Sequence, residues 1–212
     1  MILDIETIPA EEYLNNPPDW FKQSKFFPHP KLGNLVDPKK IEAKTSEWEE
    51  KGGTIKELSI ISFTAVPICI GTENKEIITI NNNILEELFA DIQHNLPLIT
   101  FNGKGFDLRI LSAFCAVNGW SDLSRAFASL ITSKYDFSTH LDLMDYAEIV
   151  LGMPYISLDE LGHFLSIPFE KQGSGADIWN WYQNNEMQKI IEHCKADIEL
   201  TRLCAEKLGF RR

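Results

Sequence analysis

The opening stretch of the chain, MILDIET (residues 1–7), alternates apolar and acidic residues from Leu3 to Glu6. Successive side chains of a β-strand point to opposite faces, so Asp4 and Glu6 would share one face while Leu3 and Ile5 share the other. Two carboxylates roughly 7 Å apart on one face repel each other and lose solvation free energy if they are covered. The stretch therefore predicts a strand that either exposes both acids to water or holds a cation between them.

Length and composition are those of a soluble globular protein. The chain has 212 residues, of which 44% are hydrophobic and 24% charged; this suffices for one α/β domain with a core and is short for two. We therefore expect a single domain over residues 1–212. The net charge of −11 argues against a general nucleic-acid coat, but it permits a local basic groove or bound divalent cations.

The chain has four cysteines without C-x-x-C spacing: Cys69, Cys115, Cys194 and Cys204. Each lies in an apolar segment, so we expect buried, reduced thiols. No positively charged, apolar leader precedes the first strand, and no apolar run has membrane-spanning length. These features predict a cytoplasmic protein that does not enter a membrane.

A long polar excursion, residues 8–56, follows the first strand and is rich in proline. It interleaves aromatic residues such as Phe26 and Phe27 with lysines, and its second half, residues 38–51, has the pattern of a surface helix. An insertion of this length in a compact domain is usually functional or disordered. Two interpretations stay open: an arm that stacks on a single nucleic-acid strand, or an arm packed over the sheet by its aromatic side chains.

Four further segments predict strands, namely residues 58–66, 76–80, 97–102 and 140–143, the last of which also fits the entry to a helix. The first two of these, joined by residues 71–75, are expected to pair antiparallel. With the opening strand they give three antiparallel strands, which strand–helix units then follow. The expected fold class is mixed α/β, with a five-stranded sheet and helices on both faces.

Helices are expected over residues 83–95, 106–118 and 176–208, the last broken near residues 184–185. Asn83 with Glu86 resembles a capping box, and Ser157 with Glu160 resembles another for a short helix that ends before Pro168. The loop between this short helix and the last helix, residues 171–175, fits either a backbone contact to phosphate or a flexible linker.

Asp107 lies where the fourth predicted strand passes into its helix, after Gly103 and Gly105, which allow a tight turn. Ligands of α/β sheets gather at this edge. Asn102, at the end of the strand, has an amide that both donates and accepts hydrogen bonds. Taken alone, Asp107 is also explained as a first-turn carboxylate that the helix dipole favours.

The last helix carries a carboxylate within an apolar stripe. The stripe follows helical spacing through Ile190, Cys194, Asp197, Thr201, Cys204 and Leu208. A carboxylate facing the core is costly unless a cation or several donors satisfy it. His193 precedes Asp197 by one turn on the adjoining edge of this face. A lone histidine is more often structural than catalytic, but a histidine one turn from such an acid is a candidate base.

Four acids thus come from a strand, a strand–helix junction and a closing helix: Asp4, Glu6, Asp107 and Asp197. Oxygen ligands without cysteine or several histidines favour Mg²⁺ or Mn²⁺ over Zn²⁺. Two such ions about 4 Å apart suit in-line displacement at phosphorus. The pattern therefore fits metal-assisted chemistry at phosphorus.

Three segments carry a resemblance to a known family: Asp-Ile-Glu-Thr (4–7), Asn-x-x-x-Phe-Asp (102–107) and His-x-x-x-Asp (193–197). In this order they resemble the three exonuclease motifs of the DEDD 3′–5′ exonucleases. The closest similarity is to the stand-alone group related to the proofreading domain of family B DNA polymerases. Stretches within residues 33–38, 140–143 and 157–161 are also similar to that group, so the resemblance spans nearly the whole chain.

The resemblance implies an RNase H-like fold and hydrolysis of nucleotides from a 3′ end with two metal ions, Mg²⁺ or Mn²⁺. It implies that Asp4, Glu6 and Asp197 hold the ion that binds the attacking water. It also implies that Asp4 bridges to a second ion, which Asp107 holds directly or through water.

We expect a single-stranded nucleic-acid substrate, with DNA favoured over RNA, and the resemblance implies that Asn102 and the backbone of Thr7 contact the terminal nucleotide. The chain is too short to contain a polymerase as well. A proofreading role would therefore need a separate polymerase, or another replication or repair protein, as partner.

The chain departs from the family pattern at His193. The third motif has the three-residue spacing of the tyrosine subclass but a histidine at the tyrosine position, whereas the histidine subclass has one more residue before its aspartate. We expect His193 to orient the attacking water and consider it as the base, because neutral imidazole accepts a proton near neutral pH. The lead before Asp4 is also short. The alternatives are a nucleic-acid-binding or scaffold module that lost the chemistry, an RNA-specific exonuclease, or an endonuclease on the same fold.

Overall fold

The computed structural model describes residues 1–10, 65–169 and 173–210. The expected arm, residues 8–56, lies outside these ranges apart from residues 8–10, and so does the helix expected at residues 38–51. Most of the strand expected at residues 58–66 and the first part of the loop at residues 171–175 also lie outside them.

Three strands form an antiparallel sheet in the order β1 (Leu3–Pro9), β2 (Ala65–Thr72) and β3 (Glu76–Ile77). The predicted antiparallel pairing is confirmed for the described residues, but the predicted ends of the second and third strands, residues 66 and 80, are wrong. A strand pattern alone favours an end near Pro67, because proline has no N–H for the ladder. The structure continues through Pro67 and places it opposite Thr7, at a register shift between Glu6 and Thr7.

A second, parallel pair consists of β4 (Leu98–Thr100) and β5 (His140–Asp142). An isolated parallel bridge between Ile2 and Ile99 joins the two sheets, and the Ile99 N–H donates to the Met1 carbonyl at 2.8 Å. The expected continuous five-stranded sheet is therefore found as three strands and two strands that meet at one bridge. Both alternatives for residues 140–143 hold, because β5 runs directly into α6 (Leu143–Val150).

The other helical segments are α3 (Asn82–His94), α4 (Asp107–Val117), α5 (Ser121–Ser129), α7 (Leu158–Phe164), the 3-10 turn η2 (Gly175–Asp177), α8 (Ile178–Gln183) and α9 (Met187–Lys207). The predicted long helices correspond to α3, α4 and the α8–α9 pair, with the predicted break between the last two. The sequence analysis gives no helix for α5. Within the described ranges, no helix combines the length and the apolarity needed to cross a bilayer.

The predicted cap of α3, Asn83, is wrong by two residues, and the predicted start of α7 is confirmed. Asn81 caps α3, with its side chain accepting from the Ile84 N–H at 3.1 Å. Three consecutive asparagines, residues 81–83, give the same local pattern, so only the packing decides which one caps. In α7, Ser157 and Glu160 form the expected capping box.

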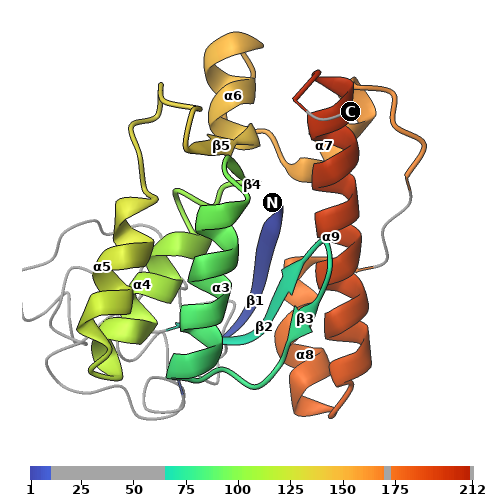
Figure 1. The fold of residues 1–212 in the computed structure, drawn as a ribbon. Coiled ribbons are helices and arrows are strands. Elements are labelled where there is room, and N and C mark those ends of the chain that lie inside the picture. The colour runs from blue at the N-terminus through green and yellow to red at the C-terminus, as the bar shows by residue number, and fades with distance from the viewer. Residues whose placement is uncertain (11–64, 170–172, 211–212) are drawn as a thin grey trace, which may run out of the picture.

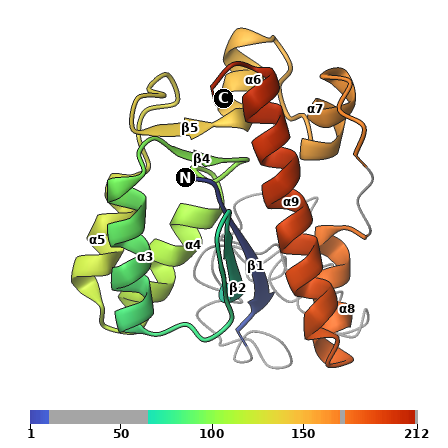
Figure 2. The same ribbon diagram turned by 45° about the vertical axis from the view of Figure 1, so that its right-hand side comes forward.

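β1 lies between two layers of helices, with α3, α4 and α5 on one side and α8 and α9 on the other (Figures 1 and 2). Leu3 and Ile5 belong to the core that contains the buried side chains of α3, α4 and α5. Ile2 and Ile8 belong to the core that contains those of α9. The two-residue alternation predicted for the strand is confirmed, and its acidic face looks toward α9.

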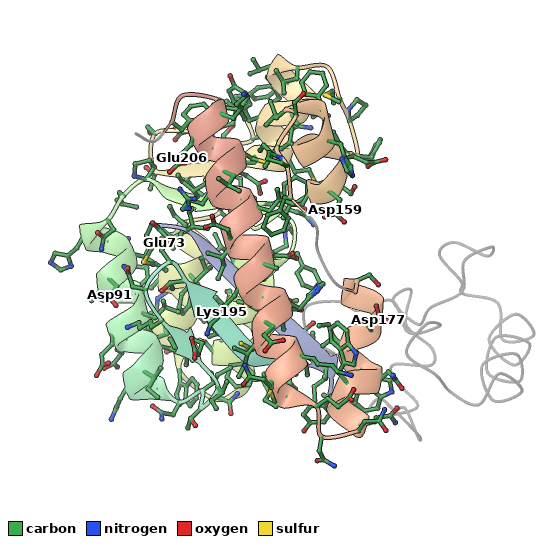
Figure 3. All side chains as sticks on the ribbon, turned by 90° about the vertical axis from the view of Figure 1, so that its right-hand side faces the viewer. Glu73, Asp91, Asp159, Asp177, Lys195 and Glu206 are labelled. Carbon is green, nitrogen blue, oxygen red and sulfur yellow. The ribbon has the colours of Figure 1, made fainter. Side chains whose placement is uncertain are left out.

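Helix α9 lies directly over β1 and β2 (Figure 3). Its close approach depends on Gly71 of β2, because a Cβ atom at Gly71 would lie 2.3 Å from Ile198 Cδ1 and 2.7 Å from Cys194 Sγ. All four cysteines are free and buried, as predicted. The sheet and α9 are therefore packed tightly at the position opposite Asp4, which pairs with Gly71.

Candidate active site

Helix α9 places a histidine between two of the predicted acids. His193 is only 3% exposed, and its Nε2 atom lies 3.8 Å from Glu6 Oε1 and 3.8 Å from Asp197 Oδ2. One potential ligand atom from each of these three residues lies within 4.8 Å of the others. These spacings are longer than hydrogen bonds, and they suit a water molecule or cation shared by the three groups.

Asp107 joins the same cluster from the start of α4. The residue is 3% exposed, and its Oδ1 atom accepts from the N–H of Ile5 at 3.0 Å. Ile5 lies between Asp4 and Glu6 in β1, so this bond fixes the Asp107 carboxylate beside the two strand acids. The structure thus brings together all four acids that the sequence analysis singled out, together with His193.

The acids perturb one another strongly. Burial, followed by the charges of Asp107, Glu6 and Asp197, raises the pKa of Asp4 well above its ordinary value. Burial also raises the pKa of Asp107 from 3.8 to about 7, although backbone hydrogen bonds, including the one from Ile5, act to lower it. Without a bound cation, the protonated forms of Asp4 and Asp107 are therefore favoured toward neutral pH, because burial and mutual repulsion both oppose their negative charge.

The surroundings of the Asp4 carboxylate indicate whether a cation fits the acid cluster. Its Oδ2 atom is buried and has no hydrogen-bond partner among the described residues. A buried carboxylate oxygen without a donor is costly, and a divalent cation would satisfy it while reducing the repulsion among the acids. The carboxylates with one imidazole form a donor set that suits Mg²⁺ or Mn²⁺.

The sequence-based choice of metal assumed that no cysteine lies near the acids, and this is wrong. One potential ligand atom from each of Asp4, Glu6 and Cys194 lies within 4.8 Å of the others. The Cys194 thiol donates to the Asp4 carbonyl at 3.8 Å. A hydrogen bond with Cys69 and burial raise the pKa of the Cys194 thiol well above its usual value. Only thiolates bind metal ions well, so hard oxygen ligands still dominate the site.

Trp181 of α8 is a second residue that the sequence analysis left out. Its ring packs edge-on against His193, with centroids 5.7 Å apart and planes at 68°. A Trp-x-Trp pattern in a short helix carries no signal for such a role. The sequence did carry a signal for Cys194, because this residue lies in the same helical stripe as Asp197.

The two predicted substrate contacts lie next to the cluster in the chain. Asn102 begins the turn that leads from β4 into Asp107, and it adopts the left-handed conformation with φ of 61°. Thr7 is buried and follows Glu6 directly, at the register shift of β1. Each therefore adjoins an acid of the cluster without belonging to it.

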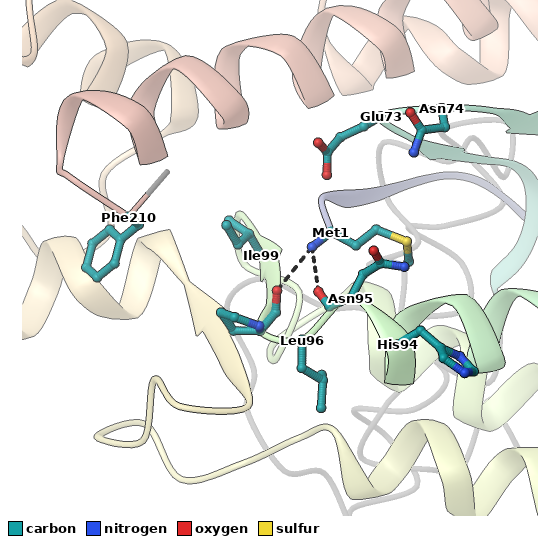
Figure 4. A pocket seen from close by; sticks show the side chains of 9 residues that line it. Met1, Glu73, Asn74, His94, Asn95, Leu96, Ile99 and Phe210 are labelled. Carbon is teal, nitrogen blue, oxygen red and sulfur yellow. Dashed lines mark hydrogen bonds between the residues drawn. The ribbon is translucent and has the colours of Figure 1, made fainter. Parts of the chain in front are cut away.

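A separate polar cavity of about 390 Å³ is lined in part by Met1, Glu73 and His94 (Figure 4). In it, the Met1 ammonium donates to the carbonyls of Asn95 at 2.8 Å and Pro97 at 3.1 Å. None of the predicted site residues lines this cavity. The acid cluster is therefore the better candidate for the functional site.

Comparison with known families agrees with this geometry. Residues 63–204 match a family described as a predicted 3′–5′ exonuclease related to the exonuclease domain of PolB. The matched segment covers more than half of the chain. The chain belongs to this exonuclease family. No curated protein and no solved structure gave a significant match.

The segment matched to the exonuclease family contains Asn102, Asp107, His193 and Asp197. Asp4 and Glu6 lie before it. Their place in the cluster therefore depends on the structure, through the Ile5–Asp107 hydrogen bond and the proximity of Glu6 to His193.

Proposed function

We propose that this member of the exonuclease family hydrolyses phosphodiester bonds at the 3′ end of single-stranded nucleic acid, with DNA preferred to RNA. The proposed mechanism uses two divalent ions, Mg²⁺ or Mn²⁺. One observation carries the proposal: acids from the first strand, the β4–α4 junction and the last helix meet beside a buried histidine. Acids that served only solubility would lie on the surface instead.

The proposal includes an RNase H-like fold in a single domain, residues 1–212. Family membership implies this fold. The Ile2–Ile99 bridge supports it, because the bridge gives the five strands the side-by-side order β3, β2, β1, β4, β5. The helices on both sides of β1 are consistent with it (Figure 2).

In the proposed site, Asp4, Glu6 and Asp197 would hold one ion, and Asp4 with Asp107 would hold the second. Such ions, when bound, lower the pKa of the attacking water and stabilise the charge that develops on both oxygens at phosphorus. The four carboxylates supply the negative charge that makes the site selective for cations. The buried Oδ2 atom of Asp4, which has no hydrogen-bond partner in the part of the chain that the structure describes, supports its role as the shared ligand.

His193 is proposed as the group that orients the attacking water and takes its proton. A neutral imidazole whose hydrogen is on Nδ1 accepts a proton at Nε2, and in His193 this atom lies between Glu6 and Asp197. The Trp181 ring limits the orientations open to the imidazole from one side. A histidine here therefore has the position and the chemistry that a base needs.

The terminal nucleotide is proposed to contact Asn102 and the backbone of Thr7. Both adjoin acids of the cluster in the chain, which supports this assignment. The physiological partner is proposed to be a separate polymerase, or another replication or repair protein. Four free, buried cysteines support a reducing, cytoplasmic location.

The proposal is tested with single-stranded DNA labelled at either end, incubated with Mn²⁺. We expect a 5′-labelled strand to give a ladder of products that shorten from the 3′ end, and a 3′ label to leave as a mononucleotide. Asp4→Asn should abolish both results, because the amide cannot replace a charged ligand. Asp159→Asn, at an exposed position of α7, is the matched control and should cleave normally.

Other outcomes would identify the alternatives. Internal cuts in both labelled strands would indicate an endonuclease. Binding without cleavage would indicate a nucleic-acid-binding module, which the histidine at the tyrosine position favours. An RNA strand of the same sequence, tested in parallel, would overturn the DNA preference if it were degraded faster.

A further inference from the structure

The turn between β4 and α4, residues 102–105, is held by side chains at each of its first three N–H groups. The Asn102 N–H donates to Asp142 Oδ1 at 2.8 Å, and the Lys104 N–H donates to Asp142 Oδ2 at 2.9 Å. The Gly103 N–H donates to Thr100 Oγ1 at 3.1 Å. Consecutive N–H groups of this kind form a concavity that binds anions. Here a carboxylate of the protein itself occupies it.

Asp142 is well placed to hold this turn. It is 2% exposed and ends β5, where it pairs in register with Thr100 of β4. Its Oδ1 atom also accepts from the Met144 N–H at 3.0 Å, and so caps α6. One carboxylate therefore links the start of a helix to the turn beside the neighbouring strand.

The turn needs external support because its backbone is strained and crowded. Asn102 is a non-glycine residue in the left-handed region, with φ of 61°. A Cβ atom at Gly103 would lie 2.3 Å from Thr100 Oγ1, and one at Gly105 would lie 2.4 Å from Asn102 Oδ1. The Asn102 side chain thus folds back over Gly105, and its position depends on the shape of the turn.

A second set of bonds anchors the turn to the segment that follows α5. Lys104 is buried, and its Nζ atom donates to the carbonyls of Ser133 at 3.0 Å and Asp136 at 3.1 Å. Thr100 Oγ1 bonds His140 Nε2 at 2.8 Å, and His140 Nδ1 bonds the Leu130 carbonyl at 3.0 Å. Burial lowers the pKa of His140 to about 4, so the ring is neutral and serves as a fixed spacer.

We propose that Asp142 is a positioning residue of the exonuclease site: its carboxylate holds the 102–105 turn in the conformation that presents the Asn102 side chain to the 3′-terminal nucleotide. The proposal rests on the proposed function for the role of Asn102. It adds that the Asp142 carboxylate of β5 sets the conformation of Asn102. The Asn-x-x-x-Phe-Asp sequence (102–107) does not set this conformation by itself. Asp142 itself does not contact the substrate.

The test is a double-mutant cycle between Asp142→Asn and Asn102→Gly in the full chain. Glycine adopts a positive φ readily, so Asn102→Gly keeps the turn and removes only the side chain. Asp142→Asn replaces one acceptor oxygen with a donor amide, which opposes an N–H group of the turn. Asp159→Asn is the matched control, because it makes the same carboxylate-to-amide change at an exposed position of α7.

We expect Asp142→Asn to lower kcat/KM on 5′-labelled single-stranded DNA by roughly 10- to 100-fold, the range typical of residues that orient a ligand group. In the Asn102→Gly background the same substitution should have almost no further effect. Mn²⁺ affinity, measured by electron paramagnetic resonance, should stay at the wild-type value. Equal fold losses in both backgrounds, or no loss in the wild-type background, would overturn the proposal.

Amide hydrogen exchange separates this proposal from the proposed function. The amides of Asn102 and Lys104 should exchange faster in Asp142→Asn than in the wild type or in Asp159→Asn, whether or not the protein cleaves DNA. An inactive wild type would refute the exonuclease mechanism, and unchanged exchange would refute the positioning role. If Asp142→Asn does not fold, Asp142→Glu replaces it, since the longer side chain keeps the charge but displaces the carboxylate from the turn.

Discussion

At the scale of single residues, the site is defined by carboxylates that titrate far from their ordinary range. Asp107 is buried, accepts backbone hydrogen bonds that include one from Ile5, and has its pKa raised from 3.8 to about 7. The unfolded chain loses this proton near pH 4, whereas the folded chain keeps it until about pH 7. Folding therefore becomes less favourable as the pH rises through this interval, if no cation is bound.

The first prediction concerns Asp107→Asn in metal-free buffer. The amide still accepts the Ile5 N–H but carries no charge. Relative to the wild type, its free energy of unfolding should rise between pH 4 and pH 7 by up to about 4 kcal/mol, from a pKa difference of roughly 3 units. Urea unfolding at a series of pH values measures this, with the exposed Asp122→Asn as control. Parallel curves for wild type and Asp107→Asn would contradict it.

The second prediction concerns His193→Ala. Loss of the imidazole should lower kcat by roughly 100-fold or more, the usual effect of removing a general base. Mn²⁺ binding should change little, because the carboxylates remain. Single-turnover cleavage together with Mn²⁺ titration measures both quantities. His163→Ala, an exposed histidine of α7, should behave as the wild type; unchanged turnover in His193→Ala would remove His193 from the mechanism.

At the scale of elements, the position of α9 over β1 and β2 decides whether the acids meet. Gly71 of β2 permits this approach, since any larger residue would collide with Ile198 and Cys194. Gly71 also pairs with Asp4 in the β1–β2 ladder. One glycine thus controls the distance between the strand acids and the helix that carries His193 and Asp197.

The third prediction is that Gly71→Ala destabilises the fold by about 1–3 kcal/mol, as expected for overpacking, and weakens Mn²⁺ binding as well. Thermal unfolding and Mn²⁺ titration measure the two effects. Gly175→Ala is the matched control, because a Cβ atom there would meet no atom of the described residues within 4 Å. If Gly71→Ala bound Mn²⁺ as the wild type does, the spacing between β2 and α9 would not set the geometry of the site.

At the scale of the whole molecule, the site joins distant parts of the chain, so its occupancy and the stability of the fold are coupled. The first strand, the start of α4 and the last helix each supply acids whose repulsion opposes folding. A cation that neutralises them stabilises the folded state by mass action. Stable folding and the proposed chemistry therefore both depend on neutralising the negative charge of these acids.

The fourth prediction is that Mn²⁺ raises the melting temperature, and that it does so more at pH 8 than at pH 5, because protons compete with the cation for the acids. At a hundredfold excess over the dissociation constant, the gain should be about 2.7 kcal/mol. Asp4→Asn should lose most of this gain. Calorimetry with and without a chelator measures it, and equal Mn²⁺ effects in wild type and Asp4→Asn would contradict the shared role of Asp4.

Local patterns were enough to predict much of the fold. The alternation of residues 3–6 predicted a strand with an acidic face, and the Ser157–Glu160 spacing predicted a helix start, because both depend only on neighbours in the chain. The strand bounds near Pro67 could not be predicted from the sequence. The strand continues through this proline because the register of its partner, β1, shifts there and no N–H is needed at Pro67. The helix α5 and the cap at Asn81 were missed for a similar reason, because tertiary packing selects among local patterns of similar stability.

The sequence by itself determined which residue types are available: four acids, a histidine and a glycine-rich turn at spacings that resemble an exonuclease. Only the tertiary structure decided that these acids lie close enough to raise one another's pKa, that Cys194 and Trp181 border them, and that Asp142 holds the turn before Asp107. The physical reason is that electrostatic and hydrogen-bonding energies depend on distance in space. Separation along the chain does not report that distance for residues as far apart as Asp4 and Asp197.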